Sequence, residues 1–136
     1  MITAVDTNVL LDIFGSDPKF GELSAKAMRT CLAQGALVAC AVVWAETATA
    51  FPSRAAFSRA MDDLSVGFDS IEKESALDAA EAWSRYRVRG GPRTRIASDF
   101  LIGAHAKSAA DRLLTRDRGF FRTHFSGLKV LDPSHH

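Results

Sequence analysis

The sequence predicts an α/β domain in which helices flank a mostly parallel sheet, an α/β/α sandwich. Short apolar segments that read as strands alternate with helical segments along the chain, and this alternation favours parallel strands joined by helices. The length of 136 residues is that of one ordinary domain. We therefore expect residues 1–136 to form a single domain whose last few residues are a tail or the remnant of a tag.

Composition excludes several classes of protein. Hydrophobic residues make up 47% of the chain, with 9 Gly and 4 Pro, which excludes a disordered or collagen-like protein. The longest apolar run, Ala36 to Ala45, is about half as long as a membrane span and ends at Glu46. Because Asp6 interrupts the first apolar stretch, we expect no secretory signal and a cytoplasmic location. Cys31 and Cys40 are expected to be reduced core residues.

Five short segments are predicted as strands. Residues 2–6 form an apolar run that ends in a carboxylate and is followed by a turn at Thr7-Asn8. Residues 36–40 and 112–115 are expected to be buried strands. The predicted strands cover residues 2–6, 36–40, 66–71, 112–115 and 128–131.

Helices are predicted between these strands. Within residues 57–64, apolar side chains recur at i, i+3, i+4 and i+7, so this segment and the helix before it form a predicted hairpin. In the helix over 74–88 we expect Leu77, Ala80 and Trp83 to face the core. Ser98 is a suitable N-cap for a helix that starts at Asp99. The predicted helices cover residues 9–14, 20–31, 41–51, 57–64, 74–88, 99–110 and 119–125.

Charge is segregated along the chain although the net charge is only +1. Residues 62–81 contain seven acids and one Lys, whereas residues 85–122 contain ten basic residues and three acids. A basic stretch of this kind attracts phosphates, so an anionic partner is favoured. The alternative interpretation is a solvated helix face followed by an arginine-rich loop.

Four carboxylates from distant segments are predicted to meet beyond the carboxyl ends of the strands, where reactive groups collect in open parallel sheets. Asp6 and Asp117 follow strands, Glu46 lies in the helix after the second strand, and Asp99 starts a helix after a loop. No Lys or Arg stands at a matching position to neutralise them. Oxygen ligands without a cluster of His or Cys suit Mg²⁺ or Mn²⁺, and such an ion would activate water against a phosphodiester.

Each acid also has a structural alternative. Asp6 could cap a helix, Asp99 could be a favourable charge at a helix N-terminus, and Asp117 could be a turn residue. Glu46 is harder to explain in this way, because a carboxylate among apolar residues is costly to bury without a partner. The agreement of all four acids with the predicted strand ends favours the metal site.

Four motifs, in order along the chain, resemble those of the PIN-domain family. They are Asp-Thr-Asn-Val-Leu at 6–10, Trp-Ala-Glu at 44–46, Ser-Asp-Phe-Leu-Ile-Gly-Ala-His-Ala at 98–106 and Leu-Leu-Thr-Arg-Asp-Arg-Gly-Phe at 113–120. The chain length and the segment 121–125 are most similar to VapC-type toxins of bacterial toxin–antitoxin pairs. The resemblance spans nearly the whole chain.

The resemblance implies a metal-dependent endoribonuclease toxin, a cognate VapB-type antitoxin that covers its site, and a homodimer. Thr115 is implied as a hydroxyl that orients ligands or water, and Asn8 matches a polar position near the first acid. The implied catalytic and metal-binding acids are Asp6, Glu46, Asp99 and Asp117.

The arginines of the loop that leads to Asp99 are the expected RNA contacts. These are Arg89, Arg93 and Arg95, which share their segment with two glycines and a proline. If that loop has another role, the RNA path moves toward the arginines at 112, 116, 118 and 122.

Two other functions compete with this interpretation. A haloacid-dehalogenase-like phosphatase also carries an Asp after its first strand and uses Mg²⁺, but it needs a second acid two residues later, where this chain has Asn8. A non-catalytic RNA- or protein-binding module is the other alternative. The intact set of acids argues against it, since mutual repulsion among four carboxylates is explained by a metal site.

Overall fold

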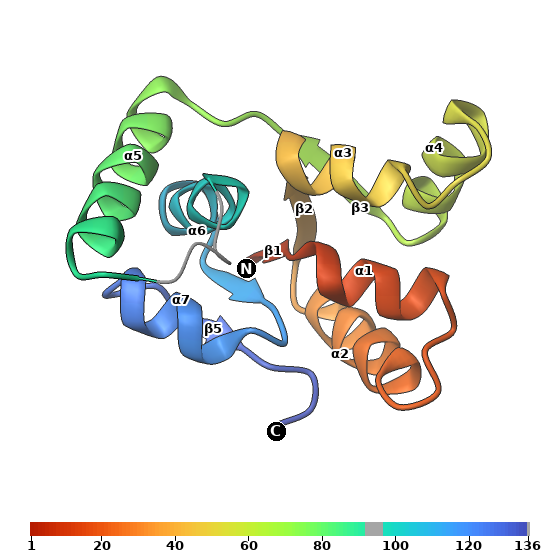
Figure 1. Cartoon of the computed structure of the whole chain (residues 1–136). Helices are drawn as coiled ribbons and strands as arrows, with labels where there is room; N and C mark the ends of the chain where they lie inside the picture. The colour runs from red at the N-terminus through yellow and green to blue at the C-terminus, as the bar shows by residue number, and fades with distance from the viewer. Residues whose placement is uncertain (92–96, 136) are drawn as a thin grey trace.

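The computed structural model describes residues 1–91 and 97–135. Its strands form one parallel sheet in the order β3-β2-β1-β4-β5 (Figure 1). The predicted fold class is therefore confirmed. The strands are β1 Ile2–Val5, β2 Ala36–Cys40, β3 Val66–Asp69, β4 Arg112–Leu114 and β5 Val130–Leu131.

Helices connect the parallel strands and cover the sheet. In Figure 1, α1 and α2 lie on one side of the strands, and α5 and α6 lie on the other. No helix in residues 1–91 and 97–135 has the length and apolar character needed to cross a membrane. The helices are α1 Thr7–Phe14, α2 Gly21–Ala33, α3 Ala41–Ala48, α4 Arg54–Asp63, α5 Lys73–Val88, α6 Ala97–Ala109 and α7 Arg118–His124.

The central strand β1 brings the first acid next to the end of β4. Val5 pairs with Leu114 in register, and the Asp6 amide donates a hydrogen bond of 3.0 Å to the Leu114 carbonyl. Strands β1 and β4 are buried along most of their length. Asp6 and Thr115 are the first residues after these strands, at the carboxyl edge of the sheet. Asp6 and Thr115 are therefore neighbours although they are far apart in sequence.

The buried face of α5 differs from the predicted one. Leu77 is 49% exposed and Ala80 is exposed, while Trp83 is half-buried. Small side chains face α6 instead, and the hydroxyls of Ser75 and Ser108 lie 2.7 Å apart. The buried residues of α5 are Ser75, Ala79, Ala82 and Tyr86. Close packing through three small residues and one ring selects this face, which the apolar pattern alone did not identify.

Two further details of the prediction are corrected. Helix α6 already includes Ala97, so Ser98 lies inside the helix and is not its N-cap. Helix α3 ends at Ala48, a few residues earlier than expected, before the turn that contains Pro52. The predicted state of the cysteines is confirmed, since Cys31 and Cys40 are buried and free.

Candidate functional site

Asp6 is the centre of the candidate site and is only 6% exposed. It follows β1 directly, so its carboxylate lies at the carboxyl edge of the sheet. The Thr7 amide donates to its Oδ1 at 2.7 Å, and the Thr115 hydroxyl donates to its Oδ2 at 2.7 Å. The Asn8 amide also donates to Oδ2, at 3.4 Å. The carboxylate is therefore held in one orientation by donors from the start of α1 and from the segment after β4.

The pKa of Asp6 is raised from its ordinary value of 3.8 to about 6. Burial is the main cause, and the negative charges of Asp99 and Glu46 raise the pKa further. Hydrogen bonds from Thr115 and Thr7 act in the opposite direction. The folded chain thus brings three of the four predicted acids close enough for their charges to interact, although they lie on three different elements.

Glu46 is half-buried on α3, the helix that follows β2. Its Oε1 accepts a hydrogen bond of 2.8 Å from the Thr7 hydroxyl. This contact supplies the partner that a carboxylate in an apolar helix requires. Thr7 was not singled out from the sequence, and its position directly after Asp6 is the signal that could have found it.

Thr115 directly follows β4 and connects the end of this strand to the site. It is fully buried, and besides donating to Asp6 it accepts a hydrogen bond of 3.0 Å from the Asp117 amide. Asn8 reaches the same segment, since its Oδ1 accepts from the Arg116 amide at 3.2 Å. These bonds hold the segment 115–117 against the start of α1. Asp117 itself is half-buried at the start of α7.

An ion pair between the half-buried Arg116 and the buried Asp12 anchors this segment to α1. Arg116 Nε donates to Asp12 Oδ2 at 2.7 Å and Nη2 donates to Oδ1 at 3.0 Å. The Ser24 hydroxyl adds a bond of 3.0 Å to Asp12, and the guanidinium lies 4.1 Å from the centre of the Phe20 ring. Asp12 is 4% exposed, so its charge depends on Arg116. Sequence reasoning missed Asp12 and Ser24, and it treated Arg116 only as a possible RNA contact.

Replacing Arg116 by Met should destabilise the protein by about 3 kcal/mol, because it leaves the buried Asp12 carboxylate without its counter-ion. RNA cleavage should fall as well, since the segment that carries Thr115 and Asp117 loses its anchor. Urea unfolding and cleavage assays on the same preparation would measure both effects. Arg122→Met, which removes an exposed arginine of α7, should change unfolding by less than about 0.5 kcal/mol; equal losses in the two variants would contradict the assignment.

The predicted arginines have different environments. Arg89 is exposed at the end of α5, whereas Arg93 and Arg95 lie outside the described residues. Arg112 is buried and donates to Thr3 Oγ1 at 2.9 Å. Because Arg112 and Arg116 are both bound to the protein's own side chains, the alternative RNA path through them is not supported.

The donor set fits a hard divalent cation in its chemistry. A buried carboxylate with two further carboxylates acting on it offers oxygen ligands and an excess of negative charge that a cation would offset. Within the described part of the chain, no group of three or more His, Cys, Asp or Glu side chains is already arranged to hold a metal ion. Because no such group is preformed in the described residues, the acids would have to move closer together around a bound ion.

Comparisons with known proteins identify the fold. The model of the PIN domain matches residues 3–126. The chain is similar to the structure of VapBC-1 from nontypeable Haemophilus influenzae, with 21% identity, a TM-score of 0.74 and coverage of 98% of this chain and 99% of that one. It is also similar to VapBC2 from Rickettsia felis bound to a DNA fragment from their promoter, with 17% identity, a TM-score of 0.73 and coverage of 97% and 98%.

A third similar structure is VapC20 of Mycobacterium tuberculosis, a toxin that cleaves the sarcin–ricin loop, with 18% identity, a TM-score of 0.53 and coverage of 82% of this chain and 86% of that one. None of the curated proteins matches the chain. The family match over most of the chain favours the PIN domain over a haloacid-dehalogenase-like phosphatase.

Proposed function

The chain belongs to the PIN-domain family, and from this membership we propose that it is an endoribonuclease that uses Mg²⁺ or Mn²⁺ to hydrolyse RNA phosphodiesters. The observation that carries the proposal is the buried Asp6 carboxylate, whose pKa is raised by burial and by the charges of Asp99 and Glu46. Charge repulsion of this kind is typical of functional sites, where a cation or a proton offsets it.

The carboxylates would hold the cation, and neighbouring hydroxyl side chains would fix the positions of the carboxylates. A bound ion of this kind supplies a water of lowered pKa and stabilises negative charge on the phosphodiester. Thr115 orients Asp6 and Thr7 orients Glu46 through their hydroxyls. The proposed ligands are Asp6, Glu46, Asp99 and Asp117.

We further propose that the protein is the toxin of a VapC-type pair and that a VapB-type antitoxin inhibits it. The structures from Haemophilus influenzae and Rickettsia felis, both toxin–antitoxin complexes, match this chain over nearly its full length, which supports an antitoxin partner. A homodimer, a single domain over residues 1–136 and a cytoplasmic location stay predictions of the same proposal.

Incubation of the purified protein with structured RNA in Mn²⁺ tests the proposal. We expect endonucleolytic fragments, and we expect the product of the gene next to its own to suppress them when the two proteins are copurified. Asp99→Asn prepared in the same way is the control for a contaminating nuclease. Intact RNA after incubation with the folded wild-type protein in either Mn²⁺ or Mg²⁺ would contradict the assignment as a ribonuclease.

A further inference from the structure

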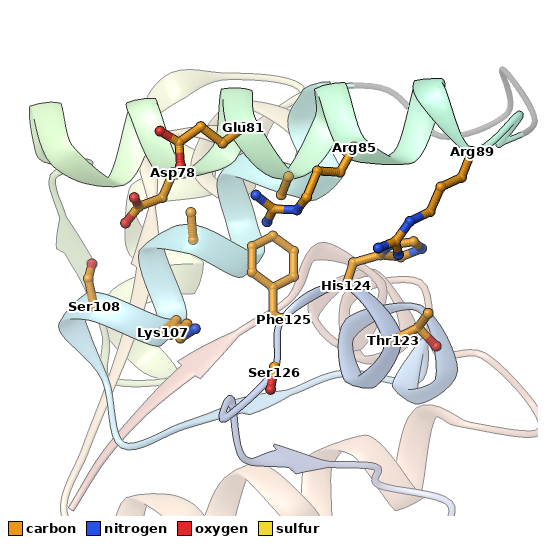
Figure 2. Close-up of a pocket in the computed structure, with 12 residues that line it drawn as sticks. Asp78, Glu81, Arg85, Arg89, Lys107, Ser108, Thr123, His124, Phe125 and Ser126 are labelled. Carbon is orange, nitrogen blue, oxygen red and sulfur yellow. The ribbon is translucent and has the colours of Figure 1, made fainter.

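A groove separate from the carboxylates lies between α5, α6 and α7 (Figure 2). Its volume is about 550 Å³. We propose that it binds phosphates of the RNA strand on one side of the cleaved bond, with Arg85 and Arg89 as the cationic contacts. The proposal rests on the proposed function, and it extends the RNA contact from the loop after α5 to the helix itself.

The two arginines project from the same face of α5 into the groove. They are four residues apart, so they stand one above the other on the helix, and Figure 2 shows both reaching toward Phe125 and His124. In the part of the chain that the structure describes, neither side chain makes an ion pair or a hydrogen bond. Arg85 also lies four residues after Glu81, which offsets part of its charge. The like charges of Arg85 and Arg89 at the same spacing repel each other, and an anion between them would offset that repulsion.

The arginines elsewhere in the basic half of the chain are less suited to this role. Arg116 is held by Asp12, and Arg112 is buried against Thr3 and Gln34. Arg87 lies on the Trp83 ring, at 5.4 Å from its centre. Arg85 and Arg89 are the arginines that line the groove, while Arg118 and Arg122 lie on α7 outside its lining.

The groove has a polarity that would orient a strand. Asp78 and Glu81 line its other end, and Figure 2 shows Asp78 beside Ser108, away from Arg89. This end also holds Lys107, next to Ser108 in Figure 2, so its two carboxylates outnumber its one cation. Phosphates would therefore be favoured at the end where Arg85 and Arg89 lie. The Ser126 hydroxyl on the opposite wall offers a further donor to a phosphate, whereas the Thr123 hydroxyl already donates to the Gly119 carbonyl at 2.8 Å.

The floor of the groove is closely packed. Phe125 is buried and lies against Gly103 of α6, where an added Cβ would come within 2.3 Å of the ring. His124 contacts the rings of Tyr86 and Phe120 at 5.1 Å and 4.8 Å between centroids. A preformed cavity of this kind lowers the entropy that binding must overcome.

The groove is close enough to the acids for one RNA strand to contact both. Ala104 lines the groove and Asp99 lies in the first turn of the same helix, so the two are separated by about 7.5 Å along the axis. A stacked strand advances roughly 3.4 Å per nucleotide. Along the α6 axis, this offset corresponds to about two nucleotides.

Salt-dependent binding of a short fluorescein-labelled single-stranded RNA of mixed sequence, measured in Ca²⁺, tests the groove. The Arg85→Ala/Arg89→Ala variant is compared with Arg54→Ala/Arg59→Ala, which removes two exposed arginines from α4 at the far side of the molecule (Figure 1). Two lost phosphate contacts should flatten the slope of log affinity against log salt by about 1.4. The advantage of the wild type over the groove variant should then shrink about sevenfold from about 50 to about 200 mM salt.

Glu81→Gln provides a test of opposite sign, because removing a carboxylate from the groove should tighten RNA binding. An equal slope in the wild type and the groove variant, or equal flattening in the α4 variant, would overturn the proposal and leave the groove to a protein partner. RNA binding with the expected slopes but no cleavage in Mn²⁺ would support the groove while contradicting the ribonuclease assignment. The two failures are thus distinguishable.

Discussion

Replacing Asp6 by Asn should reduce RNA cleavage by more than about a hundredfold, since even residues that only orient metal ligands are worth about 10- to 100-fold. The same variant should be as stable as the wild type at neutral pH, or more stable by up to about 2 kcal/mol. The raised pKa, from 3.8 to about 6, corresponds to about 3 kcal/mol against ionised Asp6 in the folded protein. Loss of the acceptor for the Thr115 hydroxyl costs about 1 kcal/mol or more in the other direction.

The pH dependence of this effect follows from the sign of the shift. The folded protein binds the Asp6 proton more tightly than the unfolded chain does. Ionised Asp6 therefore lowers the unfolding free energy by its full amount above about pH 6, and this loss of stability is absent below the ordinary pKa of 3.8. As the pH falls through this window, Asp6 contributes a rise in the unfolding free energy of the metal-free wild type. The Asp6→Asn variant lacks this pH-dependent rise in unfolding free energy. Any greater stability of the variant over the wild type should therefore disappear by about pH 4.

Asp12→Asn is the matched control for this experiment. Asp12 and Asp6 are almost equally buried, at 4% and 6% exposure, but Asp12 is paired with Arg116. Loss of its charge should therefore destabilise the protein at neutral pH. Urea unfolding of both variants across the pH range would decide the point, and a loss of stability in Asp6→Asn as large as that in Asp12→Asn would assign Asp6 to a purely structural role.

Removal of divalent cations with EDTA should abolish cleavage altogether, because water at neutral pH is a poor nucleophile without an ion that lowers its pKa. Added Mn²⁺ or Mg²⁺ should restore cleavage. Ca²⁺ should restore it poorly, since its longer bonds and looser geometry suit the site less well. Cleavage of a labelled RNA after dialysis against EDTA and readdition of each ion measures the effect.

Circular dichroism in EDTA provides the control, because the protein should stay folded without metal. Calorimetric titration with Mn²⁺ adds a readout that does not depend on RNA, and heat of binding should be lost in Asp6→Asn. Full cleavage in EDTA would contradict the metal-dependent mechanism, whatever the titration shows.

Local patterns in the sequence predicted much of the fold. The segment 36–40 was predicted as a strand with the bounds that β2 has, and Asp6 was placed at the end of the first strand, because apolar runs and their polar ends are visible over a few residues. Prediction failed where packing decided between two faces. Leu77 was expected to be buried, but the approach of α5 to α6 required small residues at the contact and left Leu77 exposed.

The sequence by itself determined the α/β class, because apolar runs and the helices between them are visible over short stretches of chain. It also predicted the four acids as ligands, and that prediction still awaits its test. Only the tertiary structure decided which side chains hold those acids. Thr115 and Asp6 are 109 residues apart, and Arg116 and Asp12 are 104 apart. The residues that neighbour Arg116 and Arg85 in the sequence do not show that the first is bound to Asp12 and the second is exposed in the groove. The two arginines differ because Arg116 packs against a buried carboxylate, which must keep a counter-ion.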